Sequence, residues 1–255
     1  MKRILVLSLA LVLAVSVLTG CSAPKPQEQP PGQPPQPGAG AQLPAAAKTY
    51  NDGTYTAAAD ADDHGYALAT VTIKDDKITA VQLKEVTEKA VDKDFNTYPY
   101  APSKEANAEM AKRFVEKNSV DVDNYTKATH SSEKYKQAVN RALEKAKVTP
   151  AVTTTYFDGT FMGRSKAGEH GYAIALVTIK GDKVTEVKLN EVTEKNEFKD
   201  YAKYPYKKSV EAHEQLPAKF VETNGRPVDT FTGATHSTAA FNAAVTSALE
   251  LAKVK

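Results

Sequence analysis

Two segments of the chain present a threonine hydroxyl in a setting suited to esterification by a phosphate group. Asp229-Thr-Phe-Thr-Gly-Ala-Thr-His-Ser-Thr238 lies near the end of the chain, and Asp123-Asn-Tyr-Thr-Lys-Ala-Thr-His-Ser-Ser132 lies in the first half. In the later segment, Gly233 and Ala234 precede Thr235 and carry almost no side chain, so a bulky group can approach the backbone closely. We therefore begin with this hydroxyl as a candidate attachment point.

The residues that follow the later segment predict the element that positions it. Phe241, Val245 and Leu249 recur every four residues and form one apolar face of a helix. We expect Ser237 or Thr238 to be the N-cap of this helix. The candidate threonine then lies in the turn before a helix N-terminus, where free N–H groups and the positive end of the helix dipole favour a phosphate.

The later segment has the pattern D-x-x-T-G-A-T-x-S-T, which resembles the site in FMN-binding domains where a flavin transferase esterifies a threonine with the phosphate of FMN. The resemblance implies Thr235 as the acceptor and leaves Thr129 open as a second acceptor. It also implies that the transferase recognises the leading aspartate. The residues that it places at the cofactor are Thr235, Gly233, Ala234, Thr232, Asp229, His236 and Ser237 in the second half, and Thr129, Asp123, Thr126 and His130 in the first.

The earlier segment departs from this pattern at Lys127, which stands where the later segment has Gly233. If the backbone there needs a positive φ, a lysine costs on the order of 1 kcal/mol. Two consequences remain open. The side chain obstructs the transferase, or its ammonium group pairs with the phosphate.

The amino terminus predicts secretion and lipid attachment. Lys2 and Arg3 precede an apolar run from Ile4 to Leu18, which is short for a membrane span. The following Leu18-Thr19-Gly20-Cys21 resembles a bacterial lipobox, which implies a signal peptide at 1–20 and a lipid on Cys21. The alternative is an ordinary secretory signal followed by an incidental cysteine. Because Cys21 is the only cysteine, an intrachain disulfide and a Cys-ligated iron–sulfur cluster are excluded, as is the usual haem attachment motif.

Residues 21–48 are predicted to be a tether. Eight prolines and no aromatic residue lie between positions 22 and 48, and such a composition cannot build a core. Two or more acyl chains on Cys21 would anchor the protein stably, and we expect it to lie on the outer side of the bacterial cell membrane. The 33 basic and 31 acidic residues of the chain nearly balance, so charge gives no case for a nucleic acid partner.

The remainder of the chain is a tandem repeat with a constant offset of 106 residues. Between 50–148 and 156–254, 51 of 99 aligned positions hold the same residue, which indicates a duplicated domain rather than a solenoid. We predict one domain at 49–148, a linker at 149–155 and a second domain at 156–255.

Each repeat predicts the same α+β domain, an antiparallel β-meander packed by helices. In the second repeat we expect Pro217 to break or restart the first helix. Two-residue hairpin turns are expected at Asp75-Asp76 and at Gly181-Asp182. The expected strands are Thr54–Ala58, Tyr66–Lys74 and Ile78–Val86 in the first repeat and Thr160–Gly163, Tyr172–Lys180 and Val184–Val192 in the second.

Histidines and tyrosines are further candidates for the site. His64 and His170 occupy equivalent positions, and two interpretations stay open for them. They are ordinary turn residues, or they donate hydrogen bonds near the isoalloxazine ring. The histidines after the acceptor threonines contact phosphate or cap the helix. No spacing typical of a metal site is present, and we predict none. The tyrosines of the two Tyr-Pro-Tyr elements stack on a flavin or close the edge of each core, and we favour the second interpretation. These are Tyr98, Tyr100, Tyr204 and Tyr206.

The resemblance covers nearly all of 48–255 and is to FMN-binding domains like those in sodium-pumping NADH:quinone reductases. The arrangement of two copies behind a lipobox and a tether resembles surface lipoproteins of extracellular electron transfer. It implies covalent FMN and a flavin transferase as partner. It also implies electrons passing from a membrane donor, on a quinol or NADH dehydrogenase pathway, to extracellular acceptors. No residue suggests a dedicated acid or base, so we expect an electron carrier more than a turnover enzyme. The alternatives are a non-redox lipoprotein that binds a ligand and a structural or adhesive surface module.

Overall fold

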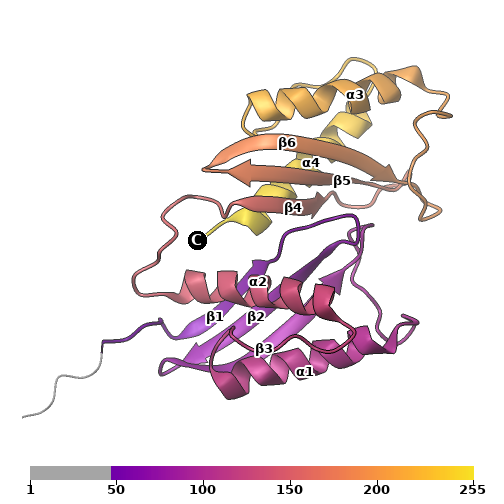
Figure 1. The fold of residues 1–255 in the computed structure, drawn as a ribbon. Helices are drawn as coiled ribbons and strands as arrows, with labels where there is room; N and C mark the ends of the chain where they lie inside the picture. Colours follow the sequence, from indigo (N-terminus) through magenta and orange to yellow (C-terminus); the bar gives the residue numbers. More distant parts are fainter. Residues whose placement is uncertain (1–46) are drawn as a thin grey trace, which may run out of the picture. The chain divides into compact units, whose positions relative to one another are not determined.

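The computed structural model describes residues 47–255 (Figure 1). The predicted signal peptide, the lipid site at Cys21 and all but the last residues of the predicted tether lie outside the described residues. Within 47–255, no helix combines the length and the apolar character that crossing a bilayer requires.

The first repeat begins with a three-stranded antiparallel sheet in the order β1-β2-β3. Its strands are β1 (Gly53–Ala58), β2 (Tyr66–Lys74) and β3 (Lys77–Val86), so β1 and β3 each begin one residue earlier than expected. Alternate residues of β2 are buried, as a half-buried strand requires. The buried face of β2 consists of Ala67, Ala69, Val71 and Ile73.

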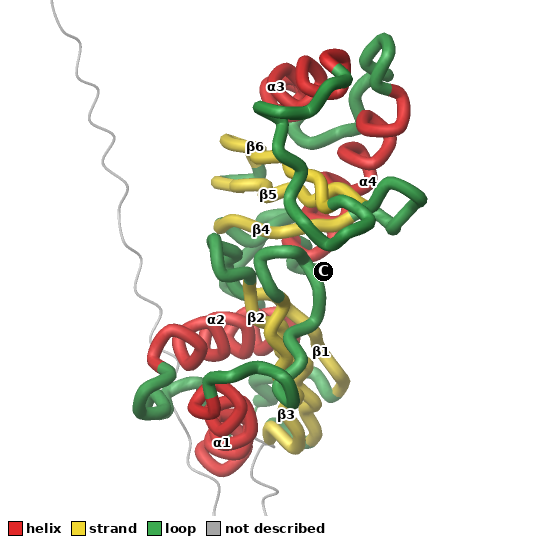
Figure 2. Tube along the Cα trace, turned by 90° about the vertical axis from the view of Figure 1, so that its right-hand side faces the viewer, coloured by secondary structure: helices red, strands yellow, loops and turns green. Residues whose placement is uncertain are grey.

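Two helices follow, α1 (Ala101–Lys117) and α2 (Thr129–Ala146), and Figure 2 shows both on one side of this sheet. Met110 and Phe114 of α1 and Tyr135 of α2 are fully buried between helices and strands. Burying a large side chain of this kind contributes roughly 1.5–3 kcal/mol. The apolar stripe of α1 therefore fixes that helix against the sheet.

The second repeat has the same order of elements, and its sheet is again antiparallel with the order β4-β5-β6. Both repeats thus confirm the expected α+β fold with meander and helices. The elements are β4 (Gly159–Arg164), β5 (Tyr172–Lys180), β6 (Lys183–Val192), α3 (Lys207–Glu222) and α4 (Thr235–Ala252).

The predicted hairpin turns are confirmed, and both have positive φ at the two central residues. Asp75 and Asp76 have φ of 51° and 60°, and Gly181 and Asp182 have φ of 53° and 62°. This geometry matches the twist of the flanking strands. The Asp182 carboxylate also accepts a 2.9 Å hydrogen bond from the backbone N–H of Tyr156, so the turn holds the chain that enters the domain.

The expectation that Pro217 interrupts its helix is wrong, because α3 continues through it to Glu222. A proline inside a helix removes one backbone hydrogen bond, and its ring crowds the preceding turn, at a cost of about 3 kcal/mol. Leu216 and Phe220, on either side of the proline, are fully buried in the core. Tertiary packing of this face overrides the local preference.

Candidate functional site

The two candidate acceptors occupy equivalent places at the start of a helix. Thr129 is the first residue of α2 and Thr235 is the first residue of α4, and both are exposed. The residue two positions earlier is left-handed in both repeats, with φ of 68° at Lys127 and 82° at Gly233. The backbone at Lys127 therefore has the positive φ on which the cost of a lysine at this position depends.

The prediction that Ser237 or Thr238 is the N-cap is wrong, because α4 begins at Thr235 and its N-cap residue is Ala234. The Thr238 hydroxyl lies inside the first turn, where it donates to the Ala234 carbonyl at 2.8 Å. It also accepts the backbone N–H of Phe231 at 3.1 Å. The hydroxyl therefore braces the turn before the helix from within.

The first repeat is braced in the same way by Ser132, which accepts the N–H of Tyr125 at 3.0 Å and donates to the Ala128 carbonyl at 2.8 Å. For both α2 and α4, no side chain of residues 47–255 caps the N-terminus by a hydrogen bond. The first N–H groups of a helix have no partner within the helix. This end of each helix therefore has donors that suit an anion.

The tyrosines of the Tyr-Pro-Tyr elements lie at the surface, so the favoured interpretation that they close the core edge is wrong. Tyr100 is 46% exposed and Tyr206 is 53% exposed. The Tyr100 hydroxyl donates to the Lys127 carbonyl at 2.7 Å, and the Tyr206 hydroxyl donates to the Gly233 carbonyl at the same distance. Each ring thus lies outside the core, and its hydroxyl holds the left-handed residue of the turn before the acceptor threonine (the acceptor turn, 123–128 in the first repeat and 229–234 in the second).

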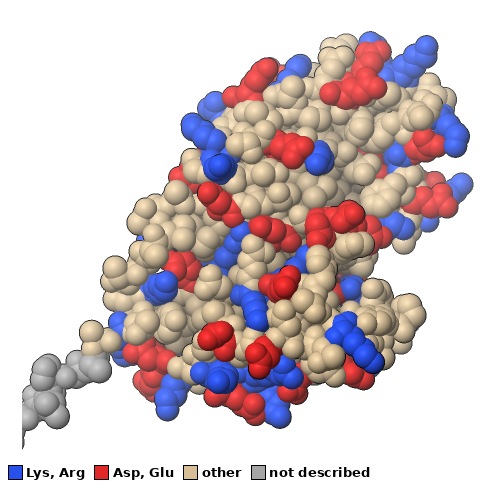
Figure 3. Space-filling view, in the orientation of Figure 1, with Lys and Arg blue, Asp and Glu red and all other residues tan. Residues whose placement is uncertain are grey.

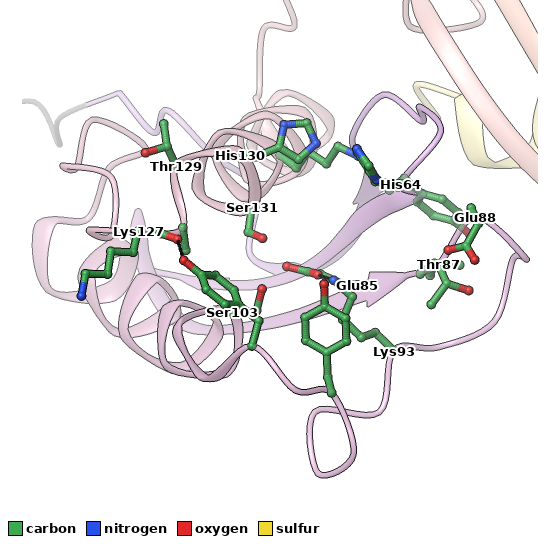
Figure 4. Close-up of a pocket in the computed structure, with 16 residues that line it drawn as sticks. His64, Glu85, Thr87, Glu88, Lys93, Ser103, Lys127, Thr129, His130 and Ser131 are labelled. Carbon is green, nitrogen blue, oxygen red and sulfur yellow. Dashed lines mark hydrogen bonds and ion pairs between the residues drawn. The ribbon is translucent and has the colours of Figure 1, made fainter.

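A pocket of about 310 Å³ lies beside Thr129 in the first repeat. Figure 4 shows Thr129 and Lys127 at one end of it and Glu88 at the other. Its residues come from the turn before β2 and the start of β2, from the end of β3 and the loop after it, from the first turn of α1, and from the start of α2 with the residues before it. The lining includes Tyr98, Tyr100, Glu85, Lys93, Ser103, Lys127, Ala128, Thr129, His130, Ser131, Lys134 and His64.

The inner wall of this pocket has a buried ion pair between Glu85 and Lys93. Their side chains are only 9% and 13% exposed. The Tyr135 hydroxyl donates to the other carboxylate oxygen at 2.6 Å. Burial alone would raise the pKa of Glu85, but hydrogen bonds from Lys93, Tyr135 and Ser131 together hold that pKa below its ordinary value. The carboxylate therefore stays charged at neutral pH.

The second repeat keeps this pair but takes its tyrosine from another element. Lys199 contacts the Glu191 carboxylate at 2.5 Å, and the Tyr201 hydroxyl donates to it at 2.9 Å. The position equivalent to Tyr135 is Phe241, which has no hydroxyl. Ser237, two residues after the acceptor threonine, also donates to the same carboxylate at 3.1 Å. The polar wall is thus joined to the first turn of α4.

Sequence reasoning missed this ion pair. The signal was present, because a lysine follows the glutamate by eight residues in both repeats. A strand glutamate and a loop lysine are each usually solvated. Only the fold buries the two together.

Histidines lie at the rim of the first pocket. His130 Nε2 is 3.1 Å from the Asp62 carboxylate, and the rings of His64 and His130 meet edge to face with centroids 5.9 Å apart. Lys134 contacts Asp62 at 2.6 Å. Burial would raise the pKa of Asp62, but the hydrogen bond from Lys134 and its charge hold that pKa below the ordinary value.

The second repeat has Gly168 and Ala240 at the positions of Asp62 and Lys134, so it lacks this rim cluster. His213 has no histidine counterpart in the first repeat, where the equivalent residue is Asn107. Its Nε2 lies 3.0 Å from the Leu189 carbonyl, and its ring stacks on the Tyr201 ring. Over residues 47–255, no group of three or more His, Cys, Asp or Glu side chains is arranged to hold a metal ion.

Most of the remaining predicted site residues lie on the turn that leads to the helix, and His236 is the second residue of α4. Asp123, Thr126, Asp229, Thr232 and His236 are exposed. Asp123 and Thr126 are not among the residues that line the first pocket. The turn therefore presents them toward solvent, where another protein can reach them.

Comparison with known proteins decides the family. A family model described as FMN-binding domain matches residues 65–144 and again 168–250. The chain belongs to the FMN-binding domain family. The two matched regions fall one in each repeat, so the protein is a flavin-binding protein with tandem FMN-binding domains.

The crystal structure of the CPE2226 protein from Clostridium perfringens is similar at 29% sequence identity, over 38% of this chain and 88% of that chain, with a TM-score of 0.34. A search of the curated proteins finds no match.

The residues of the first pocket fit an FMN group. Tyr98 and Tyr100 are 41% and 46% exposed and offer aromatic surfaces for a planar ring. The Glu85–Lys93 pair and Ser131 offer polar partners for ring heteroatoms. Thr129 stands where a phosphate would meet the helix N-terminus. When bound, FMN supplies the one- and two-electron chemistry, and the protein positions it.

Proposed function

We propose that the protein is an electron carrier in which FMN is joined by phosphoester bonds to Thr235 and Thr129. The observation that supports this is the acceptor turn. In both repeats an exposed threonine begins a helix, and a tyrosine hydroxyl holds the left-handed residue two positions before it. Such a fixed, accessible hydroxyl suits a modifying enzyme, and membership of the family supplies the cofactor.

Attachment requires an activated flavin and a flavin transferase. The threonine oxygen forms a new bond to the phosphorus of FMN, and the phosphoanhydride bond of a flavin dinucleotide such as FAD breaks. AMP leaves, and the hydroxyl proton passes to a base of the transferase. No redox change is involved, so atoms and electrons balance. We infer that the exposed Asp229 and Asp123 contact the transferase, because they lie on the same turn but face solvent.

We place the domains outside the bacterial cell membrane, anchored by a lipid on Cys21 and spaced by the proline-rich tether. Electrons then enter from a membrane donor on a quinol or NADH dehydrogenase pathway and leave to an extracellular acceptor. Basic side chains (Lys and Arg) and acidic side chains are interspersed over the face shown in Figure 3. At the pocket wall, Glu85 forms an ion pair with Lys93 and accepts a hydrogen bond from Tyr135. Groups that are already paired in this way suit adjustment of a cofactor's reduction potential more than acid–base catalysis on a substrate.

The test is the intact mass of the protein after co-expression with a flavin transferase. We expect two added FMN groups in the wild type, one in each of Thr129→Ala and Thr235→Ala, and none in the double variant. The loaded protein should be reduced by donor membranes and reoxidised by an external acceptor. A wild type that gains no mass, while a control substrate of the transferase does, contradicts the proposal. A colourless protein would instead fit a non-redox ligand-binding lipoprotein.

A further inference from the structure

Both repeats place one lysine stem against the acceptor turn, but from different backbone positions. In the first repeat it is Lys127, the left-handed residue of the turn itself. In the second repeat the equivalent residue is Gly233, and Lys208, near the start of α3, lies beside it. A Cβ atom added at Gly233 would lie 3.0 Å from Cγ, 3.3 Å from Cβ and 3.6 Å from Cδ of Lys208. The two stems thus begin at adjoining points.

The two repeats have their lysine at opposite members of the same pair of positions. Lys127 is equivalent to Gly233, and Lys208 is equivalent to Pro102, which has no amino group. Each repeat therefore has one lysine among these two positions. A side chain at position 233 would crowd the stem of Lys208. The departure from the family pattern at Lys127 is accordingly one half of a paired substitution.

The shared feature is a lysine whose aliphatic stem starts at or beside the left-handed residue, two positions before a threonine that begins a helix. A lysine is a compact positive charge that suits phosphate oxygens. The Lys208 ammonium contacts the Glu211 carboxylate at 2.7 Å, but these side chains are 51% and 38% exposed. An exposed pair of this kind contributes little to stability, so the lysine can exchange its partner for another anion.

We propose that Lys127 and Lys208 are equivalent phosphate-binding residues, each of which contacts the FMN phosphate esterified to the threonine of its own repeat. This rests on the proposed function and adds to it the residue that recognises the phosphate. It also resolves the choice left by the sequence at Lys127, since the ammonium assists flavin attachment there rather than obstructing it.

The test compares flavin transfer at each threonine by peptide mass spectrometry. Lys127→Met should slow transfer at Thr129, and Lys208→Met should slow transfer at Thr235, each by about fivefold at low salt and by less at high salt. Lys207→Met removes a neighbouring exposed lysine and should leave both rates unchanged. In the loaded protein, the ³¹P resonance of each ester should shift in the matching lysine variant and stay in place in the Lys207 variant.

The reciprocal exchange gives a second variant for each repeat. Pro102→Lys with Lys127→Gly should restore transfer at Thr129, and Lys208→Pro with Gly233→Lys should restore it at Thr235. If the wild type is loaded but Lys127→Met and Lys208→Met change neither rate nor ³¹P resonance, this inference is overturned and the proposed function stands. If the thermal stability of the unloaded variants falls in step with their rates, the lysines are structural and the inference is also overturned. A wild type without flavin contradicts the proposed function itself.

Discussion

Replacing Lys93 by methionine should destabilise the first repeat because it leaves Glu85 as a buried, unpaired carboxylate. The two side chains are 13% and 9% exposed, so solvent screens the pair weakly. Breaking a buried pair by removing one partner costs about 3–5 kcal/mol. Tyr135 still donates to the carboxylate, which favours the lower end of this range. We therefore expect a loss of about 3 kcal/mol at pH 7.

The loss should depend on pH with a defined sign. In the wild type the folded-state pKa of Glu85 is below its ordinary value of 4.5. The carboxylate therefore contributes stability above that value, and the contribution is lost as pH falls through the folded-state pKa. Without Lys93, burial raises the pKa and the acid form is favoured when folded. The stability difference between wild type and variant should shrink as pH falls to about 4.

The assay is urea unfolding followed by circular dichroism, with peptide-resolved hydrogen exchange to assign the transition to residues 49–148. Lys84→Met is the matched control, since Lys84 pairs with Asp92 but their side chains are 63% and 68% exposed. We expect it to change stability by less than about 0.5 kcal/mol. Adding Glu85→Gln to Lys93→Met should recover much of the loss. A loss below about 1 kcal/mol at pH 7, or one of equal size at both pH values, refutes the reasoning.

Three further predictions test the core, the acceptor turn and the anchor. Gly163→Ala in β4 should lower the stability of the second repeat by about 1–3 kcal/mol, because its Cβ would meet the backbone carbonyl of Ala244, and urea unfolding checks this. Tyr206→Phe removes the hydroxyl that holds the Gly233 carbonyl and should slow flavin transfer in the second repeat with little change in melting temperature. Equal transfer rates by mass spectrometry would contradict that role. Cys21→Ala should move the protein from the membrane fraction to the soluble one, and an unchanged distribution would contradict the lipid anchor.

The sequence alone predicted the features that depend on local chemistry and on comparison of the two repeats. Hairpin turns such as Asp75-Asp76 need residues that tolerate positive φ, and these are readable from residue type. The alternation in Tyr66–Lys74 likewise predicted β2 to the residue.

The features that the sequence did not predict depend on tertiary structure. The sequence predicts too late a start for α4 because Ser237 and Thr238 are typical N-cap residues, whereas the Thr238 hydroxyl bonds to the turn before the helix. Pro217 looks like a helix breaker, but buried neighbours hold the helix. The Glu85–Lys93 pair joins a strand to a loop, and no local pattern marks two charged residues that the fold buries together.

The most direct measurement of the central claim is a peptide map of the protein purified from the cells that make it. After denaturation and proteolysis, flavin fluorescence should travel with two peptides only. Fragmentation should place an FMN phosphoester on Thr235 in one and on Thr129 in the other. Flavin that separates entirely from the polypeptide on denaturation, or an ester on any other residue, would contradict the account.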